Sequence, residues 1–159
     1  MPFTIERFDS GAGAICRAIL DDLAPEWFGV PASNAAFAEE AEAGPAWIAF
    51  AAQSPVGVMV LRQVSEDAMD IHVIAVRRAH HRGGIGRAFI AVAEDGARRA
   101  GCALVSVKTR GPSGASEEYE RTRLFYRGVG FRAVEEFTEI WGPENPCLIM
   151  VKALTPPSG

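Results

Sequence analysis

Apolar residues recur along the chain with two different periods, and the alternation between them predicts a mixture of strands and helices. Ile15, Ile19 and Leu23 stand four residues apart, a spacing that places them on one face of a helix. The run 69–76 is rich in Ile and Val, as expected of a strand. These criteria predict strands near residues 3–8, 47–52, 56–64, 69–76, 102–108, 131–140 and 147–154. They predict helices near residues 12–23, before Gly44-Pro45, and near 84–100 and 116–129.

Some of these strands follow one another directly and others are separated by a helix. Gln53-Ser54-Pro55 joins two apolar runs and predicts a hairpin, whereas helical connections favour parallel pairing. We therefore expect an α/β fold with one mixed sheet of six or seven strands, flanked on both faces by about four helices. Residues 1–154 are expected to form one domain, and residues 155–159 a loose tail.

Composition narrows the class of protein. A net charge of −4 over 159 residues argues against a protein whose main partner is nucleic acid. The longest apolar stretch is interrupted and too short to span a bilayer, and no leader-like segment is visible, so we expect a cytoplasmic protein without a membrane partner. Its three cysteines, Cys16, Cys102 and Cys147, lack the spacing of a metal site, so we expect reduced core thiols and no metal.

The segment from Ile74 to Arg87 carries the strongest functional signal. A buried strand leads through the turn His80-His81-Arg82-Gly83 directly into an amphipathic helix. Glycine lets a ligand approach the backbone closely, and the free N–H groups at a helix start favour an anion. The segment contains four arginines and no acid. The pattern indicates a site for a small polyanion, and the alternative for the charges alone is a solvated helix start.

Two other nucleotide-binding patterns do not fit. No Gly-Lys followed by Ser or Thr occurs, which excludes the phosphate loop of many nucleotide triphosphatases. A dinucleotide fingerprint at Gly11-Ala12-Gly13 would place its third glycine at Cys16, and no strand-ending acid follows at the expected distance.

The chain resembles the GNAT superfamily of acyl-CoA-dependent N-acetyltransferases. Gly84-Ile85-Gly86 matches the small positions of the family's signature, and His81 stands where that signature has Gln or Arg. The segment 124–131, Leu-Phe-Tyr-Arg-Gly-Val-Gly-Phe, is similar to the family's second signature. The order of elements from Phe3 to Leu154 also matches. The resemblance implies a GNAT fold and acetyl-CoA as cosubstrate.

The resemblance also implies which residues contact the cofactor. His81 or Arg82 would contact its pyrophosphate, Tyr126 would protonate the departing thiolate, and the backbone N–H of Val76 would polarise the thioester carbonyl. The expected cofactor-binding residues are Ile74, Ala75, Val76, His81, Arg82, Gly83, Gly84, Ile85, Gly86, Arg87 and Tyr126.

Two side chains are candidates for the base that deprotonates the amine. Asp70 and His72 are two residues apart on one strand and so are expected on the same face. Asp70 aligns with a catalytic glutamate of some relatives, and a histidine can take a proton near neutral pH. Solvent is the third alternative.

The acceptor is expected beside Trp27, Phe28 and Trp141, and acidic residues such as Glu135, Glu136 and Glu139 could attract a cationic amine. The expected function is transfer of an acetyl group to a primary amine of a small molecule or peptide. The alternative is a non-catalytic acyl-CoA sensor with the same fold. Edge strands near Ile140 and Leu148 would be consistent with a homodimer.

Overall fold

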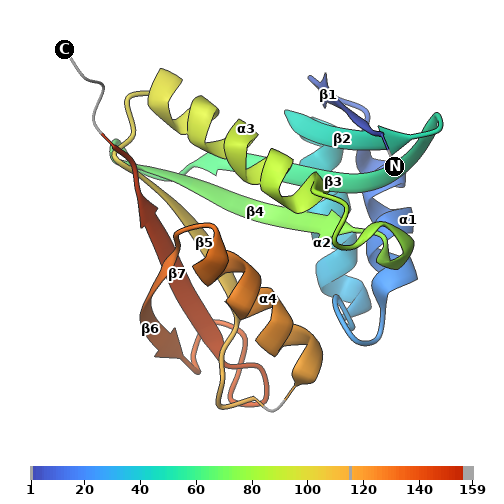
Figure 1. Cartoon of the computed structure of the whole chain (residues 1–159). Helices are drawn as coiled ribbons and strands as arrows, with labels where there is room; N and C mark the ends of the chain where they lie inside the picture. The colour runs from blue at the N-terminus through green and yellow to red at the C-terminus, as the bar shows by residue number, and fades with distance from the viewer. Residues whose placement is uncertain (1, 115, 156–159) are drawn as a thin grey trace. The chain divides into compact units, whose positions relative to one another are not determined.

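The computed structural model describes residues 2–114 and 116–155, so most of the expected tail at 155–159 lies outside the described residues. The elements follow the predicted order (Figure 1). The strands are β1 (Thr4–Phe8), β2 (Ala46–Ala51), β3 (Ser54–Gln63), β4 (Ala68–Val76), β5 (Leu104–Arg110), β6 (Arg132–Phe137) and β7 (Cys147–Ala153). The helices are α1 (Gly13–Leu23), α2 (Pro31–Ala43), α3 (Ile85–Arg99) and α4 (Glu117–Gly128), with the short 3₁₀ helix η1 (Arg78–His80).

The strands form one seven-stranded sheet in the order β1-β2-β3-β4-β5-β7-β6. Strand β4 pairs with β5 in parallel, from Ala68 opposite Leu104 to Ile71 opposite Val107. The pairs β1–β2, β2–β3, β5–β7 and β6–β7 are antiparallel. The predicted α/β class with a mixed sheet is therefore confirmed. None of the helices among the described residues is both long and apolar enough to cross a membrane.

The chain divides into two compact units. The first consists of Met1–Arg62 and His72–Val92, and the second of Gln63–Ile71 and Ala93–Gly159. Strand β4 and helix α3 each contribute residues to both units. Each unit is described below by itself.

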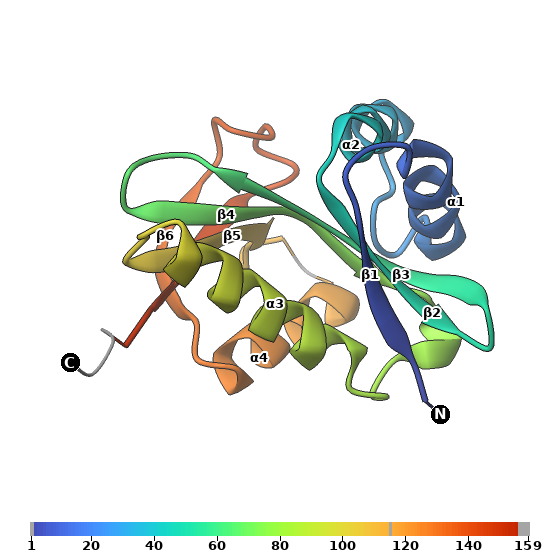
Figure 2. The same ribbon diagram turned by 90° about the horizontal axis from the view of Figure 1, so that it is seen from above.

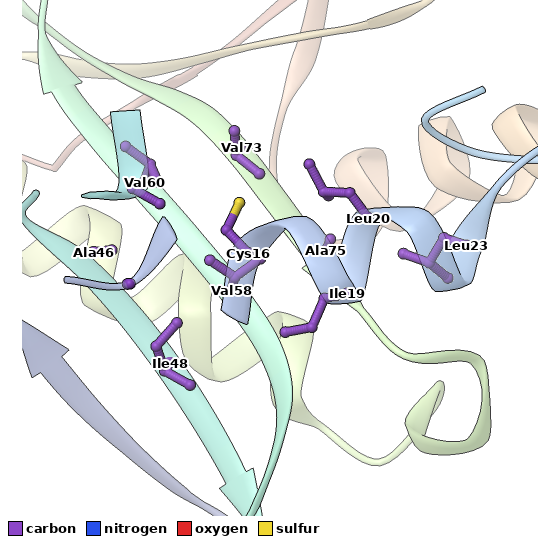
Figure 3. Close-up of a cluster of buried hydrophobic side chains, with 12 residues drawn as sticks. Cys16, Ile19, Leu20, Leu23, Ala46, Ile48, Val58, Val60, Val73 and Ala75 are labelled. Atoms are coloured by element: carbon purple, nitrogen blue, oxygen red, sulfur yellow. The ribbon is translucent and has the colours of Figure 1, made fainter. Parts of the chain in front are cut away.

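The core of the first unit lies between helix α1 and strands β2 to β4 (Figure 3). Cys16, Ile19 and Leu20 are fully buried because the helical period places them on the face that covers Val58 and Val73. Full burial of one such aliphatic side chain contributes about 1.5–3 kcal/mol.

Helix α3 covers the opposite face of the strands in this unit (Figure 2). A Cβ added to Gly57 would stand 2.9 Å from the ring of Phe89, so the absence of a side chain lets helix and sheet approach closely. Helix α2 begins with Pro31. Proline is accepted in the first turn of a helix because the N–H group that it lacks would have no partner within the helix there.

In the second unit, helix α4 lies beside strand β5. Its start is the predicted one: the hydroxyl of Ser116 accepts a hydrogen bond from the Tyr119 N–H at 3.3 Å, and acidic residues occupy the first turn. Phe131 is fully buried directly after the helix, and its N–H donates to the Tyr126 carbonyl at 2.9 Å. The helix end and the entry to β6 are therefore fixed together.

Three local expectations need correction. The hairpin turn consists of Ala52 and Gln53, with φ of 49° and 68°, because a two-residue turn with positive φ matches the twist of the strands; Pro55 lies within β3. Strand β6 ends at Phe137 and does not reach Ile140. Strand β7, which contains Leu148, lies between β5 and β6, so the edges of the sheet are β1 and β6.

Candidate active site

The connection between β4 and α3 forms an anion-binding turn. Arg82 and Gly84 have φ of 64° and 91°, in the left-handed region where glycine is at ease. An early bond of the helix joins the Ala88 N–H to the Gly84 carbonyl at 3.0 Å. The N–H groups of Ile85 and the next two residues therefore have no carbonyl within the helix to bond, and they lie at its positive end. Such a helix start binds phosphate readily.

The four arginines around this turn serve two different purposes. Arg77 forms an ion pair with Asp22 at 3.2 Å, and Arg78 forms one with Glu26 at 2.6 Å. The hydrogen bond from Arg78 lowers the pKa of the Glu26 carboxyl. By contrast, Arg82 and Arg87 are exposed, and neither forms an ion pair within the described part of the chain. Only these last two are placed to attract an external anion.

Trp27, in the connection between α1 and α2, packs against residues of the turn. Its ring lies 5.4 Å from the Arg78 guanidinium carbon and meets the His81 ring edge-on at 5.5 Å. Nε2 of His81 lies 2.7 Å from the carbonyl oxygen of Val76, so this nitrogen donates to the end of β4. Of the two donors expected for a pyrophosphate, Arg82 is thus the one whose side chain is not held against the protein.

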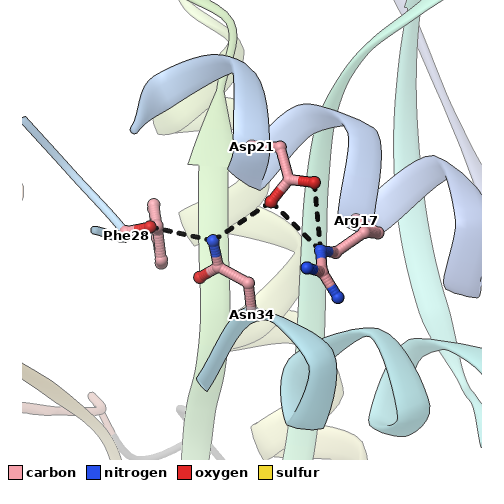
Figure 4. A network of polar contacts seen from close by, with 4 residues as sticks. All are labelled: Arg17, Asp21, Phe28 and Asn34. Atoms are coloured by element: carbon pink, nitrogen blue, oxygen red, sulfur yellow. Dashed lines mark hydrogen bonds and ion pairs between the residues drawn. The ribbon is translucent and has the colours of Figure 1, made fainter. Parts of the chain in front are cut away.

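The backbone of Phe28 belongs to a network of polar contacts that joins α1 and α2 (Figure 4). Its φ is 57°, and its carbonyl accepts a hydrogen bond from the buried amide of Asn34 at 2.8 Å. The same amide reaches Asp21 at 3.3 Å, and Asp21 is also bound by Arg17. The ring of Phe28 meets Phe37 edge-on at 6.3 Å. This network fixes the conformation of the α1–α2 connection.

His72 and Glu40 form an ion-pair contact within the first unit. Nδ1 of His72 lies 3.3 Å from Oε2 of Glu40, a residue of α2. The side chain of His72 is 29% exposed, so part of the imidazole is accessible to solvent.

Asp70, two residues earlier on β4, lies in the second unit in a more enclosed setting. Its Oδ1 accepts a hydrogen bond from the hydroxyl of Ser106 at 2.6 Å, and its Oδ2 lies 3.9 Å from Nζ of Lys108. Asp70 is opposite Ser106 in the β4–β5 register, and its side chain is only 4% exposed. A carboxylate in this position is bound on two sides by its own unit.

Tyr126 is buried near the end of α4. Its ring lies 5.5 Å from the rings of both Phe125 and Phe131. Burial, followed by the charges of Tyr119 and Asp70, raises the pKa of the Tyr126 phenol above its usual value. The phenol therefore keeps its proton at every physiological pH.

The remaining candidates are dispersed. Trp141 is 41% exposed in the connection between β6 and β7. The carboxylate of Glu136 accepts hydrogen bonds from the hydroxyl and the N–H of Ser113 at 2.7 and 3.1 Å. These bonds lower the pKa of the Glu136 carboxyl. No group of three or more His, Cys, Asp or Glu suited to a metal occurs among residues 2–114 and 116–155.

Three residues of the candidate site have no signal in the sequence. Glu40 is one of several acids in an Ala- and Glu-rich helix, and Ser106 and Lys108 are ordinary members of a strand. Their contacts with His72 and Asp70 depend on packing and on strand register. A parallel register between β4 and β5, had it been known, would have paired Ser106 with Asp70.

Comparison with known proteins identifies the family of this chain. A sequence model described as "Acetyltransferase (GNAT) family" matches residues 16–131. The chain therefore belongs to the GNAT family of acetyltransferases. Comparison with curated proteins gives no match.

Solved structures of acetyltransferases have the same fold. A protein from Desulfovibrio desulfuricans described as a GNAT-family acetyltransferase has a TM-score of 0.80 at 20% identity, over 97% of this chain and 100% of that one. An aminoglycoside 6'-N-acetyltransferase complexed with coenzyme A has a TM-score of 0.74 at 19% identity, over 98% and 99%. The ribosomal-protein-S18-alanine N-acetyltransferase from Escherichia coli has a TM-score of 0.74 at 17% identity, over 99% and 97%.

Proposed function

We propose that this acetyltransferase moves an acetyl group from acetyl-CoA to a primary amine of a small molecule or peptide. The observation that carries the proposal is the turn before α3, where positive φ values, free N–H groups and two exposed arginines coincide. Acetyl-CoA, when bound, supplies the acetyl group as a thioester. The N–H groups at the start of α3, with Arg82 and Arg87, would hold its pyrophosphate.

The end of β4 supplies the second element of the proposal. Ile74, Ala75 and Val76 are the last residues of this strand, and Ala75 packs into the core while its neighbours are half-buried. Main-chain groups anchored in this way are suited to hold the cofactor arm, and the Val76 N–H would polarise the thioester carbonyl as a fixed hydrogen-bond donor.

His72 is the base in this proposal. The amine is positively charged at neutral pH, so a group that removes its proton must be accessible to it. The His72 side chain is 29% exposed, whereas that of Asp70 is 4% exposed and bound by Ser106 and Lys108. We therefore assign proton removal to His72 and an electrostatic supporting role to Asp70.

Tyr126 would donate its phenolic hydrogen to the leaving sulfur. Because burial raises its pKa, the Tyr126 phenol is a weaker acid than free tyrosine. Its contribution is therefore stabilisation by a hydrogen bond at least as much as complete proton transfer. This favours a role for Tyr126 in the transition state over one in cofactor affinity.

The acceptor amine is not fixed by the fold. Two neighbours with the same TM-score of 0.74 are named for different acceptors, an aminoglycoside and an alanine of a ribosomal protein. Trp27 and Phe28, held by the α1–α2 connection, and the exposed Trp141 are the residues that we propose to contact the acceptor.

The proposal is tested by following thiol release from acetyl-CoA with a panel of amines that includes aminoglycosides, polyamines, amino acids and peptides. We expect release that depends on both substrates for at least one class of amine. Stoichiometric acetyl-CoA binding with no release above the background for any class would favour the non-catalytic sensor instead.

A further inference from the structure

The contact between Glu40 and His72 carries an inference that deepens the proposed function and rests on it. Glu40 lies in the last turn of α2, and its Oε2 is 3.3 Å from Nδ1 of His72. Both residues belong to the first unit, and both side chains are about one-third exposed.

The oxygen of Glu40 that faces His72 is buried and forms no hydrogen bond with any donor among the described residues, so its approach to Nδ1 is an ion-pair contact. A buried carboxylate oxygen requires a donor, and Nδ1 of His72 lies 3.3 Å from it. Two observations, the short distance and the unsatisfied Oε2 of Glu40, therefore both favour a hydrogen on Nδ1 of His72.

Neighbouring groups leave Glu40 available for this role. The guanidinium of Arg62, on β3, donates to the backbone carbonyls of Leu61 and Glu40 at 2.9 and 3.0 Å, and so anchors this turn of α2 to the sheet. The thiol of Cys16, on α1, is buried nearby, and its pKa is raised to about 12 by burial and then by the charge of Glu40. Glu40 is thus partly exposed but directs one buried carboxylate oxygen toward the interior of the unit.

We infer that Glu40 is a positioning residue that holds a proton on Nδ1 of His72 and thereby makes Nε2 the atom that accepts the proton of the amine. In a neutral imidazole one nitrogen donates and the other accepts, so a partner at Nδ1 decides the role of Nε2. The carboxylate also stabilises the imidazolium that forms when Nε2 takes a proton. Glu40 acts through the imidazole and touches no substrate.

The first test determines the tautomer directly, without any substrate. Two-bond ¹H–¹⁵N spectra of the ¹⁵N-labelled chain at about pH 8.5, where a free imidazole is neutral, resolve the nitrogens of its three histidines, with His72 assigned from the His72→Gln variant. We expect the Nδ1–H form for His72 and, as an internal contrast, the Nε2–H form for His81, which donates to Val76. An Nε2–H form of His72 in the unmodified chain would overturn the inference.

The second test compares Glu40→Gln with Glu39→Gln, which removes the same charge from an exposed neighbour on α2. At metal sites, loss of the group that orients a histidine ligand typically costs about 10- to 100-fold in metal affinity or activity, and we take this as the scale for Glu40. We expect that loss in kcat for Glu40→Gln, an unchanged KM for acetyl-CoA, and no change for Glu39→Gln. In the His72→Gln background the Glu40 substitution should have no further effect, because the two residues act as one unit.

Equal losses from Glu40→Gln in the presence and absence of His72 would contradict the inference, since they would indicate a general structural effect. The two proposals fail separately. If no amine is acetylated, the proposed function fails, yet the tautomer of His72 and its change in Glu40→Gln still decide whether Glu40 positions the imidazole.

Discussion

His72 and Asp70 are two residues apart on the same strand, yet their surroundings differ in a way that assigns them different work. Asp70 is almost fully buried, with Ser106 at one oxygen and Lys108 near the other. His72 is partly exposed and is contacted at Nδ1 by Glu40. A nearly buried carboxylate contacted at both oxygens mainly stabilises structure, whereas a partly exposed imidazole can exchange protons with a ligand.

The largest expected effect separates the two residues by activity. Replacing His72 with Gln should lower kcat/KM for the amine by about 10²- to 10⁴-fold, the usual contribution of a general base. Asp70→Asn should lower it by less than about tenfold, because Asp70 does not take the proton in this account. Steady-state kinetics on folded variants decide the matter, and the opposite ranking would reverse the assignment of the base.

Tyr126→Phe is expected to lower kcat by about 100-fold, which is the cost of removing one donor from a developing negative charge. The KM for acetyl-CoA should change little, since the ring packing on Phe125 and Phe131 is retained. Tyr119→Phe, on the same helix, is the matched control and should stay near wild-type activity. Full activity of Tyr126→Phe across the pH range would remove this residue from the chemistry.

The Asp70 network should matter more for stability than for turnover. Asp70→Asn and Ser106→Ala are each expected to lower the free energy of unfolding by about 2 kcal/mol, the scale of a hydrogen bond to a charged group. Lys108 is 40% exposed, so its contribution is weakened by solvent. Urea denaturation of both single variants and the double variant measures the coupling, and strictly additive losses would argue against a shared interaction.

The smallest expected effect is on the alkaline pH dependence of stability, through the charge of Glu40 near Cys16. The folded Cys16 thiol has a pKa of about 12, against a usual value near 9, so the unfolded chain loses this proton first as pH rises. The contribution of the protonated Cys16 thiol to the free energy of unfolding is complete below about pH 9 and is lost progressively toward pH 12. The free energy of unfolding should therefore fall above pH 9, and in Glu40→Gln this fall should end at a lower pH, because the Cys16 pKa is raised less. A fall that ends at the same pH in the two proteins would mean that the Glu40 charge does not reach Cys16.

The elements that sequence alone predicted are those with local causes. The periodic apolar positions of α1, the Ser116 cap and the glycine turn before α3 each depend on neighbours within a few residues. The sequence predicts the hairpin turn at Gln53-Ser54-Pro55, whereas the structure has it at Ala52 and Gln53, because a turn with positive φ at two non-glycine residues gives no composition signal.

The environments of the two candidate bases could not be predicted in this way. Glu40 and His72 are 32 residues apart, and the contact depends on how α2 packs. Ser106 meets Asp70 only because β4 and β5 pair in one particular register. The sequence therefore identified which side chains could act as a base, while their burial and partners, which decide between them, come from tertiary structure.

The turn before α3 is the feature on which the whole account depends, and calorimetric titration of acetyl-CoA into the folded protein tests it most directly, with ADP as the comparison. The account predicts one-to-one binding of acetyl-CoA that is tighter than binding of ADP, and weaker binding of acetyl-CoA by Arg82→Ala. Absence of heat at millimolar acetyl-CoA, from a protein shown by circular dichroism to be folded, would contradict it.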